Sequence, residues 1–182
     1  MGLTPSRPNH SACNHRGWEL VSCVAMKIHQ ITEETLLDAP LEEVFEFFSK
    51  AENLAKLTPS TLGFHILTPL PIDMKKGTLI DYNLKIRGVP VTWRTEITVW
   101  EPNVRFVDSQ LKGPYAQWIH EHRFAAEGNQ TRMWDKVDYA LPFGILGEIA
   151  HAIYVKREVE GIFAFRQKAM RQWIAERTKP QS

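Results

Sequence analysis

The chain has 182 residues and a net charge of +1, with 43% hydrophobic and 24% charged residues. This length suits one domain with a single core, and the balanced charge gives no general attraction to nucleic acid. The longest weakly polar stretch, residues 139–155, contains Pro142, Glu148 and His151 and is short for a bilayer span. We therefore expect one globular domain with no nucleic acid partner and no integral membrane segment.

Residues 1–25 show no apolar periodicity and are rich in Ser, Pro, Asn and His, which is typical of a disordered extension. The stretch Leu20-Val21-Ser22-Cys23 resembles a lipoprotein cleavage box, but the apolar run before it is too short for a signal peptide. Four residues here could bind zinc, yet they lack the paired spacing of a zinc finger: His10, Cys13, His15 and Cys23. Because the sequence has no other cysteines, the domain is expected to hold without disulfides, and a cytoplasmic location suits it.

Residues 27–37 favour a first strand, and Asp38-Ala39-Pro40 then provides a helix start with proline in the first turn. The helix that follows has one apolar face, formed by Leu41, Val44, Phe45 and Phe48. A second short helix is expected over residues 51–57, ending before Pro59. Residues 64–70 predict a strand, and residues 69–77 predict a loop.

In the region that follows, turns set the register of paired strands, and the register decides which residues share a face. A hairpin at Gly88-Val89, with Arg87 opposite Pro90, separates a charged face from an apolar one. The apolar face carries Ile80, Tyr82, Leu84, Ile86, Val91, Trp93, Thr95 and Ile97. A turn at Pro102-Asn103 continues this face to Phe106, Asp108 and Gln110.

A second hairpin is indicated by Gly128-Asn129, a strong signal for a two-residue turn. It places His122 opposite Asp135, His120 opposite Val137 and Trp118 opposite Tyr139. The inner face of the predicted sheet then carries five polar residues among aromatic and aliphatic ones: Asp108, Gln110, His120, His122 and Asp135. Buried charges need partners, so this group requires an explanation.

Three explanations are open. In the first, Asp108 pairs with His120 and Asp135 with His122 across neighbouring strands, which fixes the register and does nothing else. In the second, these groups line a cavity and orient a mostly apolar ligand. In the third, two histidines and two aspartates bind a metal, although histidines two apart also arise by chance in an alternating strand. No nucleophile elbow, phosphate loop or paired CxxC motif is present, which argues against most hydrolases, nucleotide-binding proteins and redox proteins.

Residues 147–174 predict one long amphipathic helix. From Val155 on, apolar residues recur every three or four positions and share one broad face: Val155, Val159, Ile162, Phe163, Phe165, Ala169, Met170, Trp173 and Ile174. A helix of this length needs the sheet as its partner. Arg166 projects near the centre of the apolar face, with His151 and Glu158 toward one flank, and core filling alone does not explain them.

The predicted order is a strand, two short helices, a six-stranded meander and a long C-terminal helix. It resembles the helix-grip fold of the START-related superfamily (SRPBCC), an α+β fold in which a curved antiparallel sheet wraps around the C-terminal helix. Three segments are similar to its ligand-binding, polyketide cyclase/dehydrase-like branch: ETLLDAPLEEVFEFFSKAENLAKLTP, GPYAQWIHEHRF and WDKVDYALPFG. The resemblance implies an elongated cavity between sheet and helix, used across the superfamily for lipids, polyketides, hormones and quinones. Its enzymes use different acid/base residues in different subfamilies, so no catalytic residue carries over.

We therefore expect residues 26–176 to form a helix-grip domain between a disordered extension, residues 1–25, and a flexible tail, residues 177–182. The domain is expected to bind a small, largely hydrophobic molecule, such as a lipid, polyketide or quinone-like compound, without a cofactor and without a metal. The expected ligand-binding residues are Tyr82, Trp93, Asp108, Gln110, Trp118, His120, His122, Asp135, Tyr139, Glu158, Ile162, Phe165 and Arg166.

Two other functions remain as alternatives. One is a cyclase/dehydrase-type enzyme, in which His120 or His122, oriented by Asp108 or Asp135, acts as general acid/base on an enolisable carbonyl substrate. The other is a protein-interaction or chaperone-like module, which a cavity filled by its own aromatic side chains would favour: Tyr82, Trp93, Trp118 and Phe165.

Overall fold

A computed structural model of the chain describes residues 26–177. The predicted extension, residues 1–25, and residues 178–182 of the predicted tail lie outside the described residues. The strands are β1 (His29–Leu37), β2 (His65–Ile66), β3 (Leu79–Ile86), β4 (Val89–Glu101), β5 (Arg105–Lys112), β6 (Gln117–Glu127) and β7 (Gln130–Ala140). The helices are α1 (Leu41–Ser49), the 3-10 turns η1 (Ala51–Ala55) and η2 (Ser60–Leu62), α2 (Ile145–Ala150), the π-helical turn η3 (His151–Val155) and α3 (Lys156–Arg177).

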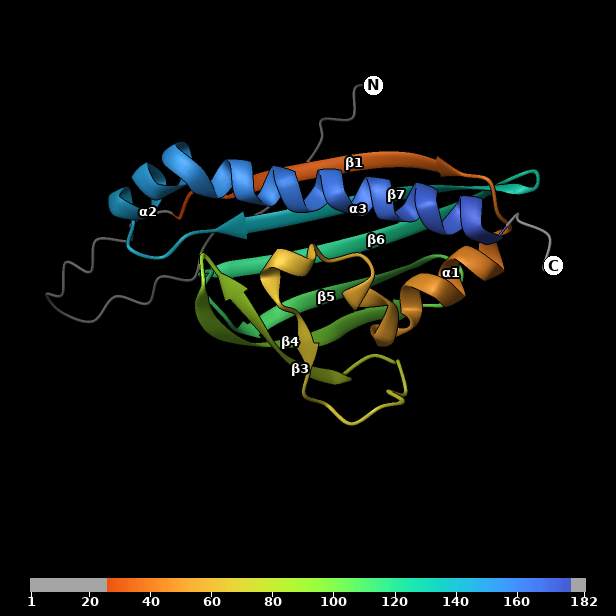
Figure 1. The fold of residues 1–182 in the computed structure, drawn as a ribbon, viewed down its shortest axis with the longest axis horizontal. Helices are drawn as coiled ribbons and strands as arrows, with labels where there is room; N and C mark the ends of the chain where they lie inside the picture. Colours follow the sequence, from red (N-terminus) through yellow and green to blue (C-terminus); the bar gives the residue numbers. More distant parts are fainter. Residues whose placement is uncertain (1–25, 178–182) are drawn as a thin grey trace, which may run out of the picture.

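The strands form one antiparallel sheet in the order β1-β7-β6-β5-β4-β3-β2. Strands β2 to β7 are therefore a meander, and β1 pairs with the last of them. The α3 helix runs along one face of the curved sheet, and α1 lies near the C-terminal end of α3 (Figure 1). This arrangement confirms the helix-grip fold that the sequence predicts. Within the described residues, no helix combines the length and the apolar composition needed to cross a bilayer.

The register of the β6–β7 hairpin is as predicted. His122 pairs with Asp135, His120 with Val137 and Trp118 with Tyr139. The predicted register of the β3–β4 hairpin is wrong by two residues, because Lys85 pairs with Pro90 and the turn lies at Arg87-Gly88, both with positive φ. A tight two-residue turn requires positive φ at both central positions. A shift of two residues keeps every side chain on its predicted face, since the strand period is two.

Three predicted elements differ in the structure. The strand expected over residues 64–70 is reduced to the two residues of β2. The N–H groups of Leu67 and Thr68 both donate to the carbonyl of Asp81, so the regular ladder ends there, and Pro69 has no N–H to continue it. The second short helix is a 3-10 turn, η1, and the irregular chain after it forms η2. Arg177, expected in the tail, is the last residue of α3, and its guanidinium pairs with Glu43 of α1.

Two apolar clusters fill the space between α3 and the sheet. One includes Phe45, Phe124 and Met170 near α1, and the other includes Val137, Val159 and Phe163 near the start of α3. Arg166 is also buried and lies between these clusters along the helix. The buried positions of α3 are Val159, Phe163, Arg166 and Met170, which corrects the predicted face: Phe165 is 37% exposed. The space beside Arg166 is where the candidate site lies.

Candidate functional site

A cavity lies between the sheet and α3, and the segment of α1, η1 and η2 closes one side. Its volume is about 180 Å³, far more than the roughly 10–15 Å³ that one water molecule requires. Nine of the thirteen predicted ligand-binding residues line it: Tyr82, Trp93, Asp108, Trp118, His120, His122, Glu158, Ile162 and Arg166. These residues come from β3, β4, β5, β6 and α3. The inward-facing residues of the four strands and one face of the helix therefore border the same space.

The other four predicted residues do not line the cavity. The Gln110 side chain donates to the carbonyl of Tyr115 at 2.7 Å and so holds the β5–β6 loop. The Tyr139 hydroxyl lies 2.9 Å from Nε2 of His151, and its ring packs against Trp118 of the cavity wall. Phe165 is turned toward the surface, and Asp135 is 2% exposed beneath the two histidines. Gln110 and Tyr139 thus have other polar partners, the histidines cover Asp135, and Phe165 lies on the exposed side of α3.

Sequence reasoning missed the wall formed by the irregular segment after α1. Leu54, Leu57 and Leu62 line the cavity from this side, next to Phe48 of α1. Their segment has no long period that would place it against the sheet, because 3-10 turns are short and loosely patterned. Tyr115 in the β5–β6 loop also lines the cavity, and it too was missed because a loop has no sequence period. The aromatic side chains therefore surround the space and do not fill it.

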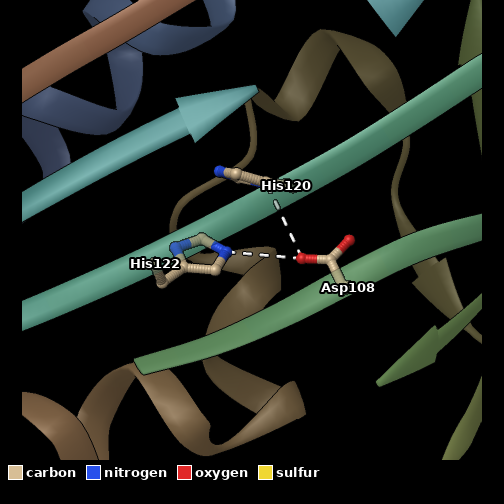
Figure 2. A group of neighbouring side chains, drawn as sticks. All are labelled: Asp108, His120 and His122. Atoms are coloured by element: carbon tan, nitrogen blue, oxygen red, sulfur yellow. Dashed lines mark ion pairs between the residues drawn. The ribbon is translucent and has the colours of Figure 1, made fainter. Parts of the chain in front are cut away.

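The inward histidines and aspartates form one cluster, not two separate pairs. His120 Nε2 hydrogen-bonds to Oδ1 of Asp135, and Nδ1 of His122 lies 3.1 Å from the same oxygen. On the other side, Oδ2 of Asp108 lies 3.4 Å from Nε2 of His122 and 3.7 Å from Nδ1 of His120. Asp108 faces both rings from the neighbouring strand (Figure 2). The predicted pairs are thus wrong as exclusive pairs, since each carboxylate contacts both rings.

Arg166 completes the cluster from α3. Its Nε lies 2.8 Å from Oδ2 of Asp135, and its Nη2 lies 3.4 Å from Nδ1 of His122. The contact to Asp135 is an ion pair, although neither of its two atoms has a hydrogen-bond partner of good geometry among the described residues. The guanidinium also lies over the ring of Phe48, 5.7 Å from its centroid. The role of Arg166 in the apolar face is therefore to compensate a buried carboxylate.

These contacts set the charges of the cluster. Burial alone would raise the pKa of Asp135, but Arg166 and the two imidazoles outweigh it and hold that pKa well below its usual value. Burial and then the charge of His122 lower the pKa of His120. For His122, burial is outweighed by Asp135 and Asp108, which raise its pKa. Of the two imidazoles, His122 is therefore the one that takes up a proton more readily.

The cavity wall also contains an unpaired donor. The Nε1 atom of Trp93 is buried and has no hydrogen-bond partner in the described part of the chain. The ring packs against Tyr82, Tyr115 and Trp118, with centroids 5.6–6.0 Å away. Leaving a buried donor unpaired costs about 1–3 kcal/mol, so an acceptor that reached this N–H would be stabilising.

The comparisons with known proteins agree with this fold. The sequence profile of the family described as polyketide cyclase/dehydrase and lipid transport matches residues 37–160. Among solved structures, the Zhui aromatase/cyclase from a Streptomyces species is 16% identical, with a TM-score of 0.62 over 85% of this chain and 98% of its own. A START superfamily protein from Mycobacterium smegmatis is 14% identical, with a TM-score of 0.62 over 82% and 99%.

The same architecture occurs in a plant protein. The major latex-like protein of Panax ginseng is 11% identical, with a TM-score of 0.60 over 84% of this chain and 99% of its own. A search of the curated proteins finds no match. At these identities the structural likeness establishes the fold alone, and the function has to be argued from the cavity.

Proposed function

Because the chain belongs to the polyketide cyclase/dehydrase and lipid transport family, we propose that it binds a small, largely hydrophobic molecule between the sheet and α3. The candidate ligands are a lipid, a polyketide and a quinone-like compound. The cavity is the observation that carries the proposal: aliphatic and aromatic side chains from both layers surround a space that the core leaves unfilled. Binding sites for small molecules have this composition, with few polar groups that fix the orientation.

The polar groups of the wall narrow the proposed ligand. The indole N–H of Trp93 is buried without a partner, so a ligand whose acceptor oxygen, such as a carbonyl or a phenol, reached it would be stabilised. Asp108, His120 and His122 offer a second polar point on the neighbouring strands β5 and β6. A mostly apolar molecule with one or two oxygen atoms matches this pattern better than a pure hydrocarbon.

We favour binding over acid/base turnover because of the contacts of the two imidazoles. Each ring has one nitrogen facing Asp135 and the other facing Asp108. A general acid or base needs a nitrogen within hydrogen-bond reach of the substrate. Here a substrate would first have to displace Asp108, so the cyclase/dehydrase alternative needs a rearrangement that ligand binding does not.

The test is native mass spectrometry of the protein purified from its own host, combined with titration by an apolar, environment-sensitive dye. We expect a small molecule to copurify with the protein. After that molecule is removed, we expect one dye molecule to bind per chain. Ile162→Trp, which fills the cavity from α3, should weaken dye binding, whereas Ala164→Trp on the exposed face of the same helix should not. Equal dye affinity in the two folded variants would place the dye outside the cavity and contradict the proposal.

A further inference from the structure

Three side chains on neighbouring strands converge on one point of the cavity wall (Figure 2). Asp108 lies on β5, and His120 and His122 lie on β6. One ligand atom from each residue lies within 4.8 Å of the other two. Imidazole nitrogen and carboxylate oxygen are donors that zinc and other first-row divalent ions prefer.

The spacing of these atoms suits a coordination sphere. Zinc bonds to histidine nitrogen and carboxylate oxygen are about 2.0–2.2 Å long, so the ligand atoms of a tetrahedral site lie roughly 3.3–3.5 Å apart. Oδ2 of Asp108 lies 3.4 Å from Nε2 of His122 and 3.7 Å from Nδ1 of His120. Two of the three distances are therefore close to those of a tetrahedral site, and the two histidine nitrogens lie within 4.8 Å of one another.

A second set of contacts orients both rings. His120 Nε2 hydrogen-bonds to Oδ1 of Asp135, and His122 Nδ1 lies 3.1 Å from the same oxygen. The proton of His120 then lies on Nε2, and the lone pair of its Nδ1 faces Asp108. Nδ1 of His122 has the acceptor Asp135 at 3.1 Å and the donor Nη2 of Arg166 at 3.4 Å; the shorter contact favours a proton on Nδ1, which leaves the lone pair of Nε2 facing Asp108. A carboxylate behind a histidine ligand recurs in protein metal sites, because it fixes the tautomer and makes the ligand more basic. Here one buried carboxylate serves both histidines, and Arg166 holds it at 2.8 Å.

The charge of the cluster also favours a cation. With both imidazoles neutral, Asp108, Asp135 and Arg166 leave one net negative charge at a buried place. Buried charge has to be neutralised. A proton on the imidazole pair brings this charge to zero. A divalent cation that displaces the proton changes the charge from minus one to plus one, and an anionic oxygen atom at an open coordination position would then bring it to zero.

We propose that Asp108, His120 and His122 bind one divalent transition-metal ion, best matched by zinc, with a coordination position open to the cavity. The three residues line the cavity, so this position faces the space in which a ligand would lie. Asp135 is a positioning residue behind the two histidines. The open position would take water or an oxygen atom of a bound molecule. This metal site does not depend on the proposed binding of an apolar molecule, since metal binding can be measured without any organic ligand.

The test uses the full chain with Cys13→Ser and Cys23→Ser, which removes its two thiols. The protein is stripped with a chelator, dialysed and titrated with zinc in competition with a chromophoric chelator. We expect one zinc ion per chain, and cobalt(II) in its place should give the visible absorption of a low-coordinate nitrogen/oxygen site. Asp108→Asn and His120→Gln should each weaken zinc binding by at least about 100-fold, and Asp135→Asn by about 10–100-fold.

His65→Ala is the matched control, because it removes an exposed histidine on β2 and should leave zinc affinity unchanged. Circular dichroism shows which variants are folded, and Asp108→Asn, which keeps the shape of the side chain, decides the case if the histidine variants unfold. Absence of zinc binding, or zinc binding that survives Asp108→Asn in the folded protein, overturns the proposal. Dye binding to the cavity is measured separately, so failure of the metal site leaves the proposed ligand binding intact.

Discussion

Arg166 of α3 and Asp135 of β7 meet between the helix and the sheet, with Nε 2.8 Å from Oδ2 and both side chains buried. The pair joins the two layers of the fold at the point where the apolar core is interrupted. Taking two charges out of water costs several kcal/mol per ion, and their attraction returns this only while both partners are present. Either residue without its partner would therefore be a buried, uncompensated charge that lowers the stability of the fold.

Arg166→Met should therefore lower the free energy of unfolding by about 3–5 kcal/mol, because it leaves the carboxylate of Asp135 buried without its guanidinium partner. Adding Asp135→Asn should recover much of this loss, since the stranded charge is gone. Arg171→Met, on the exposed side of the same helix, is the control and should stay within about 0.5 kcal/mol. Denaturant unfolding measures all three, and a double variant no more stable than Arg166→Met would contradict the role given to the pair.

Substitution by alanine should have opposite effects on stability at Gly147 and at Gly161. A Cβ at Gly147 of α2 would lie 2.3 Å from the carbonyl oxygen of Pro142, whereas a Cβ at Gly161 of α3 would meet nothing within 4 Å. Gly147→Ala should therefore destabilise the protein by about 1–3 kcal/mol through overpacking. Gly161→Ala should stabilise it by up to about 1 kcal/mol, because alanine is the better helix former. Thermal melts of the two variants check the prediction, and a neutral Gly147→Ala would show that the α2 backbone relaxes.

Thr131 of β7 hydrogen-bonds to the turn between β1 and α1 and so holds this turn against the sheet. It is fully buried, and its hydroxyl donates to the carbonyl of Ala39 at 2.8 Å. Thr131→Val keeps the shape but removes the donor, so the free energy of unfolding should fall by about 1–3 kcal/mol. Thr92→Val, at an exposed position of β4, should change it by less than about 0.5 kcal/mol. If the free energy of unfolding falls equally in the two variants, the hydrogen bond of the Thr131 hydroxyl does not stabilise the fold.

Deleting residues 1–25 should leave the melting temperature nearly unchanged, because the patterned sequence begins only at Met26. The measurement is a calorimetric comparison of the full chain with the shortened one. A fall of more than a few degrees, on the order of 1 kcal/mol for a domain of this size, would show that the extension contributes to the fold.

The sequence by itself determined the strand faces and the β6–β7 register. Gly128 at positive φ permits the tight turn, and a turn of known length fixes which residues pair, so His122 stands opposite Asp135. The β3–β4 register was missed by two residues, but the faces survived because the strand period is two. These features are local, and a short stretch of sequence contains the information that decides them.

The tertiary structure alone decided how the polar residues meet. Strand pairing predicts partners directly opposite, whereas Asp135 also bonds to His120, a diagonal neighbour, and to Arg166 from another layer. The rotation of α3 about its axis exposed Phe165, which the sequence placed on the same apolar face as the buried Arg166. The irregular segment after α1 supplied a cavity wall that no periodicity predicts. Helix orientation and loop placement depend on packing between segments far apart in the chain, so they become fixed only when the layers close on one another.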